Sequence, residues 1–155
     1  MGARSAVCGP AADRLGTVPP RFLDHLAFDV ADLEASRRFY RAALAPWGAH
    51  EVHAGAAYGY GPPGAEDVWI AAGVPGPPLH VALCAPDRAT VDAFHRAALA
   101  AGGRDNGAPG LRPRYHPGYY AAYALDPDGN NVEAVHHGGG AQGWDGAQAG
   151  ATGAG

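Results

Sequence analysis

The chain has 155 residues, of which 47% are hydrophobic and 17% charged, and its formal net charge is −4 at pH 7. This length suits one globular domain with a single core, and the scattered basic residues argue against a surface for nucleic acid or anionic membranes. No apolar run approaches the roughly 18 residues that span a bilayer. Two cysteines and no apolar leader predict a cytoplasmic protein without a disulfide framework. The abundance of Ala, Gly, Pro and Arg is typical of a GC-rich bacterial genome.

The two ends of the chain differ in composition from its middle. Residues 1–20 show no hydrophobic periodicity and end in Val18-Pro19-Pro20, so we expect a flexible N-terminal extension. Residues 138–155 are nearly all Gly, Ala and Gln, apart from Trp144, and predict a disordered tail. The folded domain should therefore occupy residues 21–137.

The first half of this domain predicts one strand, one helix and three short strands. Leu26, Phe28 and Val30 alternate with more polar positions, as on a strand with one buried face. Asp32 then precedes a helical apolar stripe that runs to about Leu44, which is typical of an N-cap. The expected strands that follow cover residues 50–54, 57–60 and 67–72.

The second half repeats the first at a constant offset of 55 residues. We interpret this as a true internal repeat, because identical pairs of His, Asp, Phe and Arg share one register. It defines a first module at about 21–74 and a second at about 77–137, whose helix is predicted from Asp87 to about Leu99. The matching pairs are His25/His80, Ala27/Ala82, Asp32/Asp87, Phe39/Phe94 and Arg41/Arg96, followed by a shared Ala-Ala-Leu.

A β-hairpin closes the second module. Residues 119–125 and 131–136 flank the turn sequence Asp-Pro-Asp-Gly at 126–129, in which Pro and Gly suit a type I turn with a G1 bulge. If Asp126 pairs with Asn130 across this turn, Tyr123 lies opposite Glu133 and shares its face. Glu133 is then a carboxylate on the side of the strand away from the core.

Three side chains are candidate metal ligands. His25 and His80 both lie on the strand face opposite the aliphatic residues, and Glu133 joins them. A single strand histidine is more often a hydrogen-bonded structural residue, but two at matching repeat positions favour metal binding. Two His and one carboxylate leave positions open for substrate. His116, in the loop before the hairpin, is a candidate acid or base, or a pocket residue.

These motifs resemble the vicinal oxygen chelate superfamily of glyoxalases, bleomycin-resistance proteins and extradiol dioxygenases. The resemblance covers roughly residues 22–137 and rests on the start Leu-Asp-His25-Leu, the helix opening after Asp32 and the ending Asp-Pro-Asp-Gly-Asn-Asn-Val-Glu133. It implies an α+β fold in which two paired βαβββ modules form a cup-shaped mixed sheet with helices on the outside. It also implies one divalent ion (Fe, Zn, Ni or Mn) held by His25, His80 and Glu133.

The chain departs from the four-ligand pattern of this family at Trp69. Matching Val68 to Val132 places Trp69 where a fourth ligand would lie, and an indole offers a metal no lone pair. The resemblance then favours the two-His, one-Glu set of extradiol dioxygenases, although other acid–base residues of those enzymes are missing. Trp69, Tyr123 and His116 would line the substrate pocket, with His116 or Tyr123 moving protons.

The sequence therefore predicts a metal-dependent lyase, isomerase or extradiol-type dioxygenase that chelates vicinal oxygens of a small molecule. The alternative is a metal-free protein that binds an antibiotic or metabolite, as bleomycin-resistance proteins do. A purely structural role would leave Glu133 and the paired histidines unexplained. The expected partner is a small-molecule substrate, with the chain either a monomer or a homodimer formed by module exchange.

Overall fold

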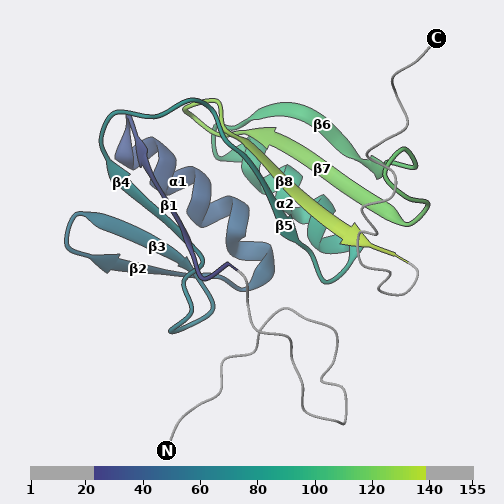
Figure 1. Ribbon diagram of the computed structural model, residues 1–155, viewed down its shortest axis with the longest axis horizontal. Helices are drawn as coiled ribbons and strands as arrows, with labels where there is room; N and C mark the ends of the chain where they lie inside the picture. Colours follow the sequence, from purple (N-terminus) through teal and green to yellow (C-terminus); the bar gives the residue numbers. More distant parts are fainter. Residues whose placement is uncertain (1–22, 139–155) are drawn as a thin grey trace, which may run out of the picture.

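The structure is a computed structural model that describes residues 23–138 (Figure 1). The N-terminal extension and all but the first residue of the C-terminal tail expected from the sequence, including Trp144, lie outside this range. The first module contains β1 (Leu26–Val30), α1 (Leu33–Leu44), the 3-10 helix η1 (Ala45–Trp47), β2 (His50–Ala54), β3 (Ala57–Gly61) and β4 (Val68–Ala72). The second contains β5 (His80–Cys84), α2 (Arg88–Ala100), β6 (Arg104–Leu111), β7 (Tyr119–Leu125) and β8 (Asn131–His137).

The two modules have the same topology, which confirms the predicted α+β fold of paired βαβββ units. The strand orders are β1-β4-β3-β2 and β5-β8-β7-β6. In each sheet the first and last strands of the module run parallel and the other neighbours antiparallel. Ala27 lies beside Trp69 in one sheet and Ala82 beside Glu133 in the other, so Trp69 and Glu133 occupy equivalent positions.

Each helix begins where the sequence predicts. The Asp32 carboxylate accepts a hydrogen bond from the Ala35 amide at 2.9 Å, and the Asp87 carboxylate accepts one from the Thr90 amide at 2.7 Å. These bonds satisfy amide groups that the first helical turn leaves without partners. Neither helix of residues 23–138 is long and apolar enough to cross a membrane.

The hydrophobic core joins the two modules through their helices. One face of each sheet and both helices contribute to a single buried cluster that includes Val30, Phe39, Ile70, Phe94 and Ala134. Figure 1 shows α1 packed on the first sheet and α2 packed on the second. The two helices also contact each other. The other face of each sheet lies away from this core, and those two faces carry the candidate site residues.

Polar contacts also connect the modules. The Tyr40 hydroxyl donates to Asp126 Oδ2 at 2.7 Å, and the indole nitrogen of Trp47 donates to the Cys84 carbonyl at 2.7 Å. Asp126 is 1% exposed and also accepts hydrogen bonds from the turn that precedes β8. A buried carboxylate with this many donors fixes the end of the second module against α1.

The hairpin prediction is confirmed, whereas β6 was not located from the sequence. Tyr123 pairs with Glu133, and the Gly129 amide donates to the Asp126 carbonyl with Gly129 at φ 89°. The residues of β6 read RDNGAPGL and show no apolar alternation, because its pairing with β7 shifts register on both sides of Gly107. An irregular edge strand of this kind has no period that a pattern could reveal.

Candidate functional site

The free face of the second sheet holds a histidine–carboxylate pair. His80 Nε2 lies 2.8 Å from Glu133 Oε2, with the His80 side chain 54% exposed and that of Glu133 only 3%. Both residues come from the adjacent parallel strands β5 and β8. Burying a charged carboxylate in a sheet costs free energy, so the buried Glu133 side chain needs hydrogen-bond donors close by.

Two tyrosines of β7 cover the same carboxylate. The Tyr119 hydroxyl donates to Glu133 Oε1 at 2.6 Å, so both carboxylate oxygens have partners. The Tyr123 hydroxyl is buried and makes no hydrogen bond among the described residues. Burial and the nearby Glu133 charge raise the pKa of Tyr123 to about 12 and raise that of Tyr119 further. Both hydroxyls therefore keep their protons at neutral pH and can only donate to an anionic group.

A guanidinium group lies against Tyr123. The Cζ atom of Arg112 is 5.5 Å from the centre of the Tyr123 ring, and its Nη atoms donate to the carbonyls of Ala108 and Leu111. Gly107 leaves the space for this arrangement, because a Cβ there would come within 2.7 Å of the tyrosine ring. The second sheet thus places a positive charge over the ring of Tyr123.

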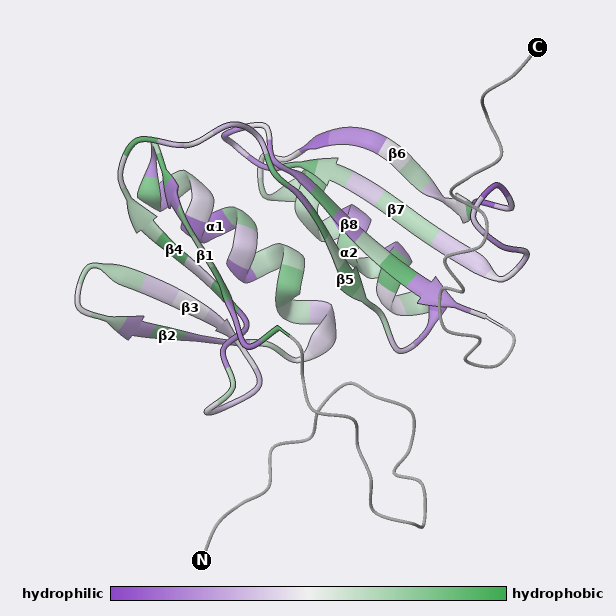
Figure 2. Ribbon diagram, viewed as in Figure 1, coloured by the Kyte–Doolittle hydropathy of each residue, from purple (hydrophilic) through white to green (hydrophobic). Residues whose placement is uncertain are grey.

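His116 lies at the end of this face and pairs with a second histidine. The Nε2 atom of His116 is 2.8 Å from Nδ1 of His137, the last residue of β8. Figure 2 shows this end of β8 as hydrophilic. The Nδ1 atom of His116 accepts a hydrogen bond from the Gly118 amide. The acceptor role of Nδ1 means that Nε2 carries the proton and donates it to His137. Burial and the neighbouring histidines lower the pKa of His137. The ring of Tyr119 contacts both imidazoles and links this pair to Glu133.

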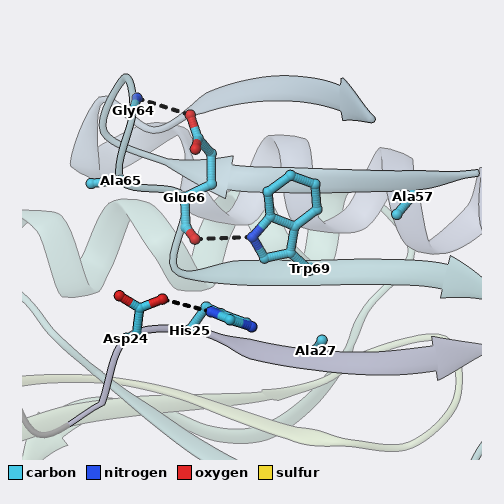
Figure 3. A pocket seen from close by; sticks show the side chains of 8 residues that line it. All are labelled: Asp24, His25, Ala27, Ala57, Gly64, Ala65, Glu66 and Trp69. Carbon is cyan, nitrogen blue, oxygen red and sulfur yellow. Dashed lines mark hydrogen bonds and ion pairs between the residues drawn. The ribbon is translucent and has the colours of Figure 1, made fainter. Parts of the chain in front are cut away.

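The free face of the first sheet contains a cavity of about 560 Å³ (Figure 3). Trp69 on β4 and His25, which directly precedes β1, line it together with Asp24, Glu66 and four small residues. His25 Nδ1 lies 2.7 Å from Asp24 Oδ1, and since a carboxylate only accepts, Nδ1 carries the proton. The Nε2 atom of His25 is then left with its lone pair, as in histidines that a carboxylate orients for metal binding.

The structure divides the predicted site residues between two faces. It brings His80, Glu133 and Tyr123 together on the second sheet, with His116 at its end, and it brings His25 and Trp69 together on the first. No group of three or more His, Cys, Asp or Glu side chains within residues 23–138 is placed to hold one metal ion. The three predicted ligands therefore do not converge within the described part of one chain.

A family model described as the Glyoxalase/Bleomycin resistance protein/Dioxygenase superfamily matches residues 22–134. The chain belongs to this superfamily. Among solved structures, a glyoxalase/bleomycin resistance protein from Albidiferax ferrireducens T118 is 32% identical, with a TM-score of 0.66 over 75% of this chain and 98% of that one. No curated protein matches the chain.

Two further solved structures are more distant and support the fold alone. A glyoxalase/bleomycin resistance protein/dioxygenase family enzyme from Burkholderia phytofirmans PsJN is 19% identical, with a TM-score of 0.57 over 74% of this chain and 97% of that one. A lactoylglutathione lyase from Agrobacterium tumefaciens is 22% identical, with a TM-score of 0.56 over 77% and 96%.

The donor atoms of the second sheet are suited to the divalent metal that many members of this superfamily use. An imidazole nitrogen and a carboxylate oxygen are ligand types for Zn, Fe, Ni and Mn, and the two atoms are already neighbours. The carboxylate is held in place by Tyr119, as ligating carboxylates commonly are. These two groups would supply half of a four-coordinate sphere.

Several contributors to the site, among them Tyr119, Arg112 and Glu66, were not identified from the sequence. Tyr119 could have been found, because it shares the period-2 face of Tyr123 and Glu133 on the predicted hairpin. Arg112 and Glu66 had no such signal, since both lie outside recognisable periodic segments. Their positions depend on how β6 and the loop before β4 fold over the sheets.

Proposed function

We propose that this chain is a metal-dependent enzyme of the glyoxalase/dioxygenase type, which chelates vicinal oxygens of a small substrate at a divalent ion. The observation that carries the proposal is the contact of 2.8 Å between His80 Nε2 and the buried carboxylate of Glu133. A structural role gives little reason to keep a carboxylate 3% exposed within a β-strand, because burying it is costly, whereas a ligand role does.

We further propose that a second copy of the chain supplies His25. His80 and Glu133 alone leave a divalent ion with two protein ligands, and catalytic sites commonly use three. His25 is the repeat mate of His80 and presents Nε2 on a face that the core of its own chain does not cover. A symmetric dimer that seats the first sheet of one copy against the second sheet of another would form two equivalent sites.

The residues around this site suit chemistry on an oxygen that gains negative charge. When bound, a divalent ion would act as a Lewis acid for that charge. Tyr123 stays protonated and can donate a hydrogen bond to the same oxygen, and Arg112 adds a positive charge over the Tyr123 ring. His116 can exchange a proton with His137, and through it with solvent, which supports the role of proton carrier.

Metal analysis of the purified, reconstituted chain tests the proposal. We expect one divalent ion per chain, and we expect His80→Ala to abolish binding. His53→Ala, a strand histidine that stacks on Tyr58 in the first module, is the matched control and should keep the ion. Absence of bound metal after reconstitution with each of Fe, Zn, Ni and Mn would remove the proposal.

Mixing two inactive variants tests the origin of His25. His25→Ala and His80→Ala each destroy every site in their own homodimers, but a mixed dimer contains one site with both histidines intact. Random mixing should therefore restore metal to about a quarter of all sites. If the site forms within one chain, mixing restores none.

The cavity beside Trp69 also supports a second candidate, a metal-free binding protein. An indole occupies the position equivalent to Glu133, so the first sheet offers an aromatic surface where the second offers a ligand. A drug-protection or ligand-binding assay that is unaffected by His80→Ala and by chelators would favour this function over the enzyme.

A further inference from the structure

We infer that the cavity of the first sheet binds a flat aromatic molecule that carries a positive charge, with its ring against Trp69 and its cation beside Asp24 and Glu66. This inference rests on the proposed function and deepens it, because it names the class of substrate that the site would take. It depends on the shape and the charge of the cavity, which can be tested without metal.

The indole of Trp69 forms a fixed platform. It lies over Gly59 on the neighbouring strand, where an added Cβ would come within 2.7–2.8 Å of three ring atoms. Its nitrogen donates to the Glu66 carbonyl at 3.0 Å, which holds the orientation of the ring. Ala27 and Ala57 beside it are small, so the ring borders open space (Figure 3). An indole that is oriented in this way, with free space beside it, suits the stacking of a planar group.

The charge of the cavity wall favours a cation. Among the described residues that line it, Asp24 and Glu66 are carboxylates and none is Arg or Lys. Figure 3 shows both carboxylates at the same end of the cavity, with Ala27 and Ala57 at the other. An indole face also attracts cations through its quadrupole. A ligand with a cationic end and an apolar end therefore matches the cavity, whereas a carboxylate or phosphate at the acidic end would be repelled.

The size of the cavity is consistent with such a ligand. Its volume of about 560 Å³ falls within the roughly 300–1,000 Å³ of sites for drug-sized molecules. His25 Nε2 borders the same space, so a ligand on Trp69 would reach the face that the proposed metal ligand occupies. The aromatic cation would be one part of the substrate, and the oxygens that react would be another.

Calorimetric titration of the full chain in EDTA with three probes tests the inference. The probes are benzyltrimethylammonium, neutral benzyl alcohol and benzoate, and we expect affinity to fall in that order. Glu66→Gln keeps the acceptor for the Gly64 amide but removes the charge. It should weaken the cation about threefold or more and leave benzyl alcohol unchanged.

Gly59→Ala tests the platform directly, because the added methyl displaces the indole. We expect about threefold to thirtyfold weaker binding of the ammonium probe, the range of a lost cation–π contact. Gly76→Ala is the matched control, since no atom lies within 4 Å of a Cβ there. Trp69→Leu should reproduce the loss without adding volume over β3.

Binding of benzoate as tight as that of the ammonium probe, or full binding in both Gly59→Ala and Trp69→Leu, would overturn the inference. Because EDTA is present, a failure here leaves metal binding at His80 and Glu133 unaffected. Conversely, loss of metal binding in reconstituted protein would remove the proposed function while the titrations in EDTA still report on the cavity.

Discussion

His80 and Glu133 lie 53 positions apart in the chain, yet His80 Nε2 is 2.8 Å from Glu133 Oε2. The two side chains meet because β5 and β8 are parallel neighbours and both residues point to the face away from the core. Tyr119 holds the other carboxylate oxygen at 2.6 Å. Each of these contacts makes a separate prediction about metal binding.

Glu133→Gln should lower the affinity for a divalent ion by more than about tenfold, because an amide oxygen is a weaker ligand than a carboxylate. Competition with a chromogenic chelator measures the change. Glu34→Gln removes a carboxylate from an exposed position on α1 and serves as the control. Equal affinities for the two variants would contradict the ligand role of Glu133.

Tyr119→Phe should lower metal affinity by about tenfold, because the Glu133 carboxylate loses the donor that orients it. The same competition assay applies. Tyr115→Phe is a close control, since the exposed Tyr115 ring stacks on Tyr119 but its hydroxyl contacts Arg114. Unchanged affinity in Tyr119→Phe would mean that the hydroxyl only covers the carboxylate.

Much of the fold could be predicted from the sequence, because the internal repeat indicates the same order of strands and helix in both modules. The N-caps Asp32 and Asp87, and the opposition of Tyr123 and Glu133, follow from local rules and are confirmed. The equivalence of Trp69 and Glu133, predicted by matching Val68 to Val132, is also confirmed. Residue spacing and turn residues that are local in the sequence determine these features, so the sequence predicts them.

The relation between the two modules could not be predicted in the same way. The sequence shows that His25 and His80 are equivalent, but not which faces meet in space. In the structure, α1 and α2 contact each other, and Tyr40 bonds to Asp126, so the histidine faces both lie away from the shared core. Packing between distant segments, rather than periodicity, sets this arrangement.

Tyr40→Phe should destabilise the protein by about 1.5–3 kcal/mol, the range for a hydrogen bond to a charged group. The hydroxyl is one of the donors that satisfy buried Asp126 across the two modules. Urea unfolding followed by circular dichroism measures the loss. Tyr58→Phe, on β3, is the control and should change the unfolding free energy by less than about 0.5 kcal/mol.

The same tyrosine should make the protein sensitive to alkali. Burial, and then the charge of Asp126, raise the pKa of Tyr40 well above its ordinary value of 10.0. Above that pH the unfolded chain loses the Tyr40 proton while the folded chain keeps it, so the free energy of unfolding falls as pH rises. One such proton changes the free energy of unfolding by about 1.4 kcal/mol per pH unit.

In Tyr40→Phe the decline of the unfolding free energy above pH 10 should be shallower by up to this slope. Near neutral pH, where Tyr40 is protonated in both states, the unfolding free energies of the two proteins should depend on pH in the same way. Urea unfolding at a series of alkaline pH values measures both slopes, and identical slopes above pH 10 would mean that Tyr40 ionises equally in the folded and unfolded chain.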